Sequence, residues 1–174
     1  MATYKIDADH SDIMFKVKHL MISTITGVFK KFDGTLEFNE HLSDATVTFE
    51  ADVSSVDTKN EQRDGHLKSD DFFNAEQFPK LTFKSTHIKK TGDDEYLLTG
   101  DLTIRDVTKP VELKVEYNGA TKDPWGQEKM GFEVSGKINR KDYGLKWSAV
   151  TEAGGLVVAD DVKLLMNVEM IKQA

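Results

Sequence analysis

The sequence predicts an all-β fold in which about eight antiparallel strands close into a barrel, with one short helical segment near residues 58–73. Apolar and polar residues alternate with a period of two along most of the chain, as in strands that bury one face and expose the other. Turn-forming residues separate these runs, and antiparallel sheets of this size either stack as a sandwich or close on themselves. The runs are long, which favours closure into a barrel wide enough to be filled by side chains or to hold one small ligand.

Each predicted strand has an apolar file, a set of residues of one parity that we expect to face the interior. In chain order the files are Ile13, Phe15 and Val17; Val47, Phe49, Ala51 and Val53; Leu81 and Phe83; Val111, Leu113, Val115 and Tyr117; Phe132, Val134 and Ile138; and Val162, Leu164, Met166, Val168 and Met170. Whether these side chains meet in the middle or leave a tunnel depends on strand tilt and stagger, so the sequence leaves both a filled and an open interior possible.

Turn chemistry separates the files. Phe32-Asp33-Gly34 places an Asp-Gly pair between two strand-like pieces, and Asp123-Pro124-Trp125-Gly126 has proline second and glycine fourth, as a type I turn prefers. Gly92-Asp93-Asp94 and Gly154-Gly155 predict further connections.

The segment at residues 58–73 departs from the strand rhythm. Thr58 and Glu61 fit a capping box, which predicts a helix that starts there and runs to about Lys68. Ser69 offers a second cap for a short turn that carries Phe72-Phe73, an apolar pair that needs cover. We therefore expect a helical segment tied down against the barrel by its aromatic end.

The charged residues of this helix allow two interpretations. In the first, Arg63, Asp64 and His66 form a hydrogen-bonded clasp that holds the helix on the barrel while Leu67 points inward. In the second, the helix closes one end of the barrel and Arg63 or His66 meets the polar head of a ligand. A lid explains the position of the helix better than catalysis does.

Composition limits the class of protein. A chain of 174 residues, 39% of them hydrophobic, suits a single domain over residues 1–174. The net charge of −7 disfavours nucleic acid as a partner, and the absence of cysteine excludes disulfides, thiolate metal sites and cysteine nucleophiles. We expect no cofactor. The start, MATYKIDADHSDIMF, has no basic segment followed by an apolar run, so we expect no signal peptide and a cytoplasmic location. The apolar runs are too short for stable membrane insertion.

The five histidines do not have metal-site spacing. His10, His19, His41, His66 and His87 form neither a His-x-His nor a His-Glu-x-x-His pair, so we predict no metal site. Ser, His and Asp residues are scattered without a nucleophile elbow or a phosphate loop, and we predict no catalytic residues. His19 shares the parity of Phe15 and Val17 and is a candidate polar group near a mouth of the barrel.

Several segments taken together resemble the YceI-like polyisoprenoid-binding proteins, and the resemblance covers essentially the whole chain. The segments are His10-Ser11-x-Ile13-x-Phe15-x-Val17-x-His19, Gly27-x-Phe29-x-x-Phe32-x-Gly34, Arg63-Asp64-x-His66-Leu67, Phe78-Pro79, Gly100-Asp101-Leu102-Thr103-Ile104-Arg105-Asp106-Val107-Thr108-Lys109-Pro110-Val111 and Asn139-Arg140-x-Asp142-Tyr143-Gly144-Leu145. The resemblance implies a lipocalin-like, extended eight-stranded barrel with a long apolar tunnel for isoprenoid or other amphiphilic lipids, often assembled as a homodimer.

The expected function is non-enzymatic binding and carriage of a polyisoprenoid or similar long-chain lipid. The expected ligand-binding residues are Phe15, Val17, His19, Phe49, Arg63, His66, Leu81, Phe83, Leu102, Leu113, Val115, Phe132, Val134, Ile138, Leu164 and Met166. Two alternatives remain. One is an enzyme that acts on a lipid-like substrate, and the other is a solid-cored barrel that recognises a protein partner through loop tips such as Trp125.

Arg140 keeps the parity of Val134 and Ile138, so it is expected to point inward at the end of its strand. An inward guanidinium needs a partner, for which Asp101 and Asp142 are the candidates. An ion pair that closes one end of the barrel and a contact with a ligand's head group are both consistent with this position.

Overall fold

The computed structural model of the protein describes residues 1–149 and 157–174. Within these residues it contains eleven strands and one α-helix. The strands are β1 (Ala2–Ile6), β2 (Asp12–His19), β3 (Ser23–Phe29), β4 (Phe32–Phe38), β5 (Thr46–Asp52), β6 (Val56–Asp57), β7 (Lys80–Lys90), β8 (Glu95–Ile104), β9 (Val107–Lys122), β10 (Glu128–Asn139) and β11 (Val158–Lys172). The helix α1 spans Glu61–Lys68, and the 3-10 turns are η1 (Ala8–His10), η2 (Leu42–Asp44), η3 (Val53–Ser55) and η4 (Arg140–Tyr143).

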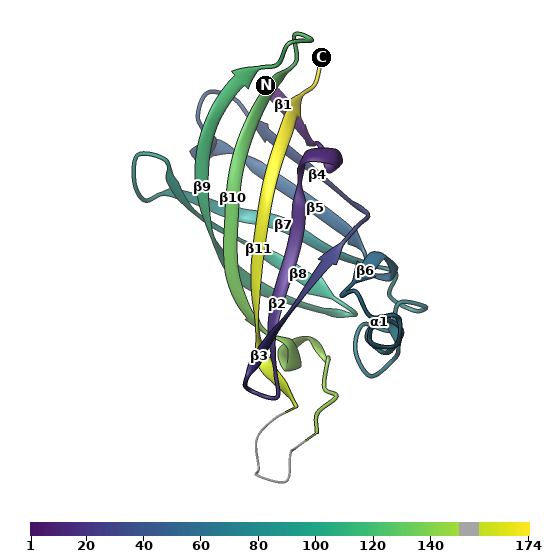
Figure 1. The fold of residues 1–174 in the computed structure, drawn as a ribbon. Helices are drawn as coiled ribbons and strands as arrows, with labels where there is room; N and C mark the ends of the chain where they lie inside the picture. The colour runs from purple at the N-terminus through teal and green to yellow at the C-terminus, as the bar shows by residue number, and fades with distance from the viewer. Residues whose placement is uncertain (150–156) are drawn as a thin grey trace.

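The eleven strands described occupy eight positions around a closed antiparallel barrel (Figure 1). Three of the positions are each occupied by two strands separated by a break: β1 with β2, β4 with β3, and β5 with β6. Both β1 and β2 pair with β11, and on their other side β1 pairs with β4 and β2 pairs with β3. In turn, β5 pairs with β4 and β6 pairs with β3. From β7 to β11 each strand pairs with the next, and β1 closes the circle against β11. The predicted eight-stranded barrel is therefore confirmed.

The break between β1 and β2 is bridged by a side chain. Ser11 is buried, and its Oγ accepts a hydrogen bond from Glu169 N at 3.0 Å and lies 3.3 Å from Glu169 O, to which it donates. The hydroxyl thus pairs with β11 where the regular backbone ladder is interrupted by η1.

The breaks in the next two strands meet in the same way. Lys30 N donates to Ser55 O at 3.2 Å, Lys31 N donates to Ser55 Oγ at 3.0 Å, and Asp52 N donates to Lys31 O at 2.9 Å. These bonds keep backbone groups paired where the β3–β4 and β5–β6 breaks lie side by side.

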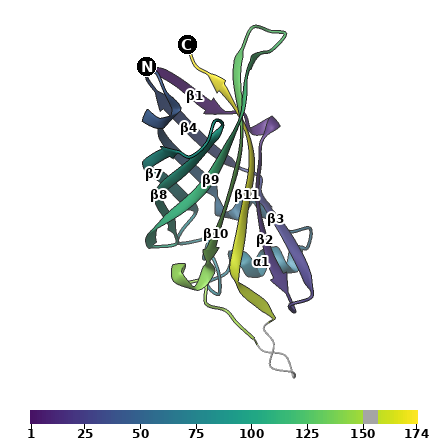
Figure 2. The ribbon, with the colours of Figure 1, turned by 90° about the vertical axis from the view of Figure 1, so that its left-hand side faces the viewer.

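The predicted apolar files face the interior. Most of their members belong to one core cluster or pack against it, and a second, smaller cluster forms around Tyr4, Leu36, Phe132 and Met170. Both views show that β1 and the end of β11 lie together at one end of an elongated barrel, whereas the β2–β3 hairpin lies at the other (Figures 1 and 2).

The turn predictions are partly confirmed. Residues 92–94 connect β7 to β8 and residues 123–126 connect β9 to β10, while Gly154-Gly155 lies outside the described residues. The Asp33-Gly34 prediction was wrong, because both residues lie within β4, where they pair with Glu50 and Phe49. A Cβ at position 34 would lie 3.4 Å from Thr48 O and 3.5 Å from the Phe49 ring, which are ordinary contact distances, so this glycine is simply a member of the strand and does not turn the chain.

The helix begins later than the capping box predicts. Its N-cap is Asn60, whose side chain accepts a hydrogen bond from Arg63 N at 2.9 Å. Lys59 has a φ of 65°, which turns the chain between Thr58 and the helix, so the Thr58 hydroxyl is not available as a cap. The predicted end at Lys68 is confirmed. Among the described residues, no helix is both long and apolar enough to cross a membrane.

Candidate functional site

The barrel encloses a cavity of about 280 Å³. Side chains from both ends and from nearly every strand contribute to its wall, and almost all of them are apolar. The inward files therefore do not meet in the middle, and the interior is open. A cavity of this kind excludes water from its wall and favours an apolar molecule that fills it.

The predicted apolar site residues all line this cavity. They are Phe15, Val17, Phe49, Leu81, Phe83, Leu102, Leu113, Val115, Phe132, Val134, Ile138, Leu164 and Met166. The three polar candidates, His19, Arg63 and His66, do not line it. The structure thus gathers the apolar set into one surface and leaves the polar set outside it.

Other lining residues were missed by strand periodicity. Leu67, Phe72, Phe73 and Leu145 come from α1, from the turn after it and from the segment after η4. Helical spacing already pointed Leu67 inward, and the adjacent aromatic pair signalled a need for cover. Met14 also lines the cavity although its parity is that of the outer face, and no pattern in the sequence indicates this.

Glycines beneath aromatic rings shape the wall. Phe15 lies over Gly27, its partner across β2 and β3, so closely that a Cβ on Gly27 would lie 2.2 Å from Phe15 Cζ. Phe83 covers Gly100 of β8 in the same way, with a Cβ–Cζ separation of 2.4 Å. Because no side chain lies beneath them, these rings can lie against the wall instead of projecting into the cavity.

Among the described residues, Arg140 is the only charged one that lines the cavity. It is 3% exposed, which confirms that it points inward. Its Nη1 donates to Leu145 O at 2.6 Å and to Trp147 O at 2.7 Å. Its Nε donates to Ala159 O at 2.9 Å and its Nη2 to Val158 O at 3.3 Å. Backbone carbonyls therefore take up most of its hydrogen-bonding capacity.

The predicted carboxylate partners of Arg140 were wrong, since Asp101 and Asp142 are both exposed. The nearest carboxylate is Asp160, whose Oδ1 lies 3.8 Å from Arg140 Nη2 and 3.2 Å from Lys141 Nζ. Burial lowers the pKa of Arg140, and the charge of Asp160 partly offsets this. Backbone carbonyls thus satisfy most of the guanidinium, and Asp160, whose side chain is 36% exposed, is its ion-pair partner.

Arg63 and Asp64 form a clasp around Thr58, which is 4% exposed. Asp64 Oδ1 accepts from Thr58 N at 2.9 Å and from Thr58 Oγ1 at 2.5 Å. Arg63 Nε donates to Thr58 Oγ1 at 2.7 Å, and Arg63 Nη2 donates to Thr58 O at 2.6 Å. These bonds hold α1 to the strand that precedes it, as the clasp interpretation predicts for Arg63 and Asp64, whereas His66, the third predicted member, contacts Asp71 instead.

His66 belongs to an aromatic cluster at the end of α1. Its ring packs edge-on against Phe72 and Trp147, each at 5.0 Å between ring centroids, and its Nε2 lies 2.8 Å from Asp71 Oδ2. Phe72 in turn lies under the Arg140 guanidinium at 5.8 Å. The cluster packs α1 against the segment after η4, where the predicted packing of Trp147 is confirmed.

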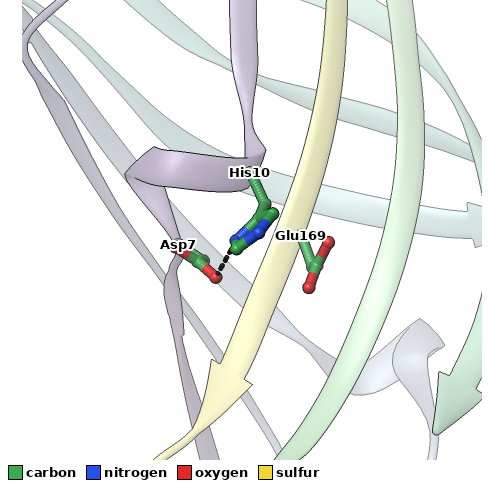
Figure 3. Close-up of side chains that lie close together, drawn as sticks. All are labelled: Asp7, His10 and Glu169. Atoms are coloured by element: carbon green, nitrogen blue, oxygen red, sulfur yellow. Dashed lines mark hydrogen bonds and ion pairs between the residues drawn. The ribbon is translucent and has the colours of Figure 1, made fainter. Parts of the chain in front are cut away.

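One group of side chains at the other end of the barrel has ligand types that suit a metal ion. Asp7, His10 and Glu169 place one oxygen or nitrogen atom each within 4.8 Å of one another (Figure 3). His10 Nδ1 lies 2.8 Å from Asp7 Oδ2. Lys129 Nζ, however, lies 3.3 Å from Asp7 Oδ2 and 3.1 Å from Glu169 Oε1. The ammonium group already provides the positive charge that these oxygens require, so we interpret the group as an ion-pair cluster.

The fold and the cavity together define a lipocalin-like barrel with an apolar interior. The model of the YceI-like domain matches residues 4–170. Protein YceI of Escherichia coli is 43% identical over 175 residues, covering 99% of this chain and 88% of that protein. The chain therefore belongs to the YceI-like family, which confirms the resemblance seen in the sequence.

Solved structures share this architecture. Burkholderia cenocepacia BcnA matches with a TM-score of 0.83 and 23% identity, covering 94% of this chain and 98% of that one. A polyisoprenoid binding domain from Saccharophagus degradans, implicated in plant cell wall breakdown, matches with a TM-score of 0.73 and 16% identity, covering 98% of each chain. At these identities the two structures show the fold alone.

Proposed function

We propose that this protein binds and carries a polyisoprenoid or similar long-chain amphiphilic lipid inside its barrel, without chemical conversion. The observation that supports this most directly is the apolar cavity of about 280 Å³. The structural neighbour from Saccharophagus degradans is a polyisoprenoid binding domain, which adds support for this class of ligand.

The energetics suit a ligand without precise polar contacts. Transfer of a hydrocarbon chain from water into an apolar wall gains about 0.8 kcal/mol for each buried CH₂. A long chain thus binds through many equivalent contacts, and neither a metal nor a cofactor is required. An enzyme acting on a lipid-like substrate receives less support, because Arg63 and His66 are engaged in the clasp and the aromatic cluster and do not line the cavity.

The first experiment is organic extraction of the purified protein followed by mass spectrometry. We expect a long-chain amphiphile in the extract, or, if the chain is purified empty, uptake of an added fluorescent polyprenol. Folded protein that neither yields a lipid nor takes up the polyprenol would contradict the proposal. Turnover of the added lipid would instead favour the enzyme.

A matched pair of variants locates the binding. Val134 lines the cavity and Glu133, its neighbour on β10, is exposed on the outer face. Val134→Trp fills the space of several CH₂ groups and should weaken polyprenol binding at least about tenfold. Glu133→Trp introduces the same side chain outside and should leave binding unchanged. Equal binding by both folded variants would place the ligand elsewhere.

A further inference from the structure

We propose that the tip of the β2–β3 hairpin, residues Leu20, Met21 and Ile22, docks on an anionic lipid membrane surface. These three large apolar side chains are consecutive and are 39%, 65% and 84% exposed. The β2–β3 hairpin lies at the end of the barrel opposite the chain termini (Figures 1 and 2). Three adjacent exposed apolar side chains at a projecting tip form a surface suited to an apolar medium.

The backbone of the tip makes this composition unusual. Leu20 and Met21, the first two of the three residues that connect β2 to β3, have φ values of 53° and 63°, so both central residues of the turn closed by Ile22 N and His19 O are left-handed. Such turns strongly favour Asn-Gly or Asp-Gly, because large side chains are strained in this conformation. Leu-Met neither relieves that strain nor contributes to the core. The turn chemistry of the hairpin therefore does not explain the apolar residues.

A basic band lies behind the tip on the outer face of the barrel. Lys16 and Lys18 of β2 alternate with the inward-facing Val17, and Lys163 of β11 is paired directly with Lys16. Within the described part of the chain none of these three lysines forms a salt bridge, and the nearby Asp161 is paired with Lys137 at 3.5 Å. In a chain of net charge −7, this band is a local site of attraction for anionic head groups.

The shape of the tip favours a membrane over a protein partner. A stable protein interface buries roughly 800 Å² on each side, more than three side chains on a narrow turn provide. Insertion at the boundary between head groups and acyl chains needs no complementary surface, only apolar side chains in front of basic ones. The apolar tip lies at the end of β2, and the basic band lies behind it along the same strand.

The tip also adjoins the cavity. Val17 and Val158 both line the cavity, and Val158 is paired with His19, the residue directly before Leu20. Docking would bring this end of the cavity close to the lipid surface. The inference goes beyond the proposed function, and vesicle binding can be measured on protein with or without a ligand in its barrel.

The test is flotation of the full chain with phosphatidylcholine vesicles that contain or lack phosphatidylglycerol. We expect the wild type to float with the anionic vesicles and to be released by salt. The triple variant Leu20→Asn, Met21→Gly, Ile22→Ser installs the favoured turn residues, so it should fold at least as stably as the wild type. It should lose at least about tenfold in partitioning, the equivalent of one buried apolar side chain.

Two further variants complete the test. Lys16→Gln with Lys18→Gln should reduce the anionic preference, whereas Trp125→Ser, which removes a side chain 85% exposed at the other end of the barrel, should change nothing. Equal flotation of the triple variant and the wild type would overturn the proposal, as would the absence of wild-type binding. A change of oligomeric state in the triple variant, without a change in flotation, would assign the tip to contact between copies of the chain.

Discussion

At the scale of single residues, two pairs of glycine and phenylalanine shape the wall of the barrel interior. Phe15 lies over Gly27 and Phe83 lies over Gly100, and in each pair the two residues are on adjacent strands. Each ring takes the space in which a Cβ of the glycine position would stand. The two pairs differ in one respect. A Cβ on Gly100 would also approach Lys84 O at 2.5 Å, whereas a Cβ on Gly27 would meet atoms of the Phe15 ring alone among its nearest neighbours.

The Gly27 pair gives the cleaner prediction. In Gly27→Ala the methyl group would displace the Phe15 ring toward the cavity, because the ring can rotate while the sheet backbone remains in place. We expect a loss of stability of about 1–3 kcal/mol and weaker uptake of a fluorescent polyprenol. Urea unfolding and polyprenol titration measure the two effects.

Gly65→Ala is the control for this substitution. A Cβ at position 65 would meet nothing within 4 Å, and alanine favours the helix in which this residue lies. Uptake should be unchanged and stability should rise slightly. Uptake by Gly27→Ala equal to that of the wild type would mean that the ring does not control the cavity.

At the scale of elements, the clasp on Thr58 determines whether α1 stays in place. Asp64→Ala removes the acceptor of two hydrogen bonds and leaves the backbone N–H of the buried Thr58 unpaired. We expect the free energy of unfolding to fall by about 1–3 kcal/mol. Amide hydrogen exchange should become faster than in the wild type, most of all over residues 61–68. Gln62→Ala, an exposed position on the same helix, serves as the control. Unchanged exchange in Asp64→Ala would show that the aromatic cluster alone holds the helix.

The elements differ in how well the sequence predicts them. The apolar files were predictable because a strand buried on one face repeats its pattern every two residues, and one face of β10 runs from Phe132 to Ile138 in this way. The later start of α1 was not predictable, since it depends on a left-handed Lys59, and lysine has no preference for that conformation. The place of Gly34 inside β4 was missed because a glycine within a strand and a glycine in a turn look alike in one sequence.

The candidate site shows the same division. Parity placed Arg140 inside, but its partners are carbonyls of residues 145, 147, 158 and 159, which any residue type supplies. The open cavity depends on the curvature of the barrel and on rings that lie over glycines of adjacent strands. The period-two pattern of a single strand predicts neither the curvature nor the ring positions.

At the scale of the whole molecule, an ion-pair cluster holds the seam where the barrel closes. Lys129 of β10 lies among Glu169 of β11, Asp7 just after β1, and Asp123 in the β9–β10 turn, with Nζ–O distances of 3.1, 3.3 and 3.7 Å. His10 adds a hydrogen-bonding contact to Asp7. Because β1 is short and lies between β4 and β11, this cluster adds side-chain contacts at a closure that few backbone pairs hold.

The protonation of this cluster sets its pH dependence. Burial raises the pKa of Asp7, but hydrogen bonds from His10 and Lys129 outweigh it, and the pKa lies below its ordinary value of 3.8. The hydrogen bond to Glu169 raises the pKa of Lys129 above 10.5. A lowered carboxyl pKa stabilises the fold above about 3.8 and loses that contribution as pH falls through the folded value. A raised lysine pKa stabilises it below 10.5 and loses that contribution as pH rises through the folded value.

Lys129→Met should therefore have its largest effect at neutral pH. Without the ammonium group, the carboxylates of Asp7, Asp123 and Glu169 repel one another, and in acid the wild type itself loses the contribution of Asp7 as pH falls through its lowered pKa. We expect the deficit in thermal midpoint relative to the wild type to be greatest near pH 7 and to shrink toward pH 3. Lys80→Met removes an exposed lysine paired with Glu50 and should have a small effect throughout. A Lys129→Met deficit that stays constant across this range would show that its methylenes, and not its charge, hold the seam closed.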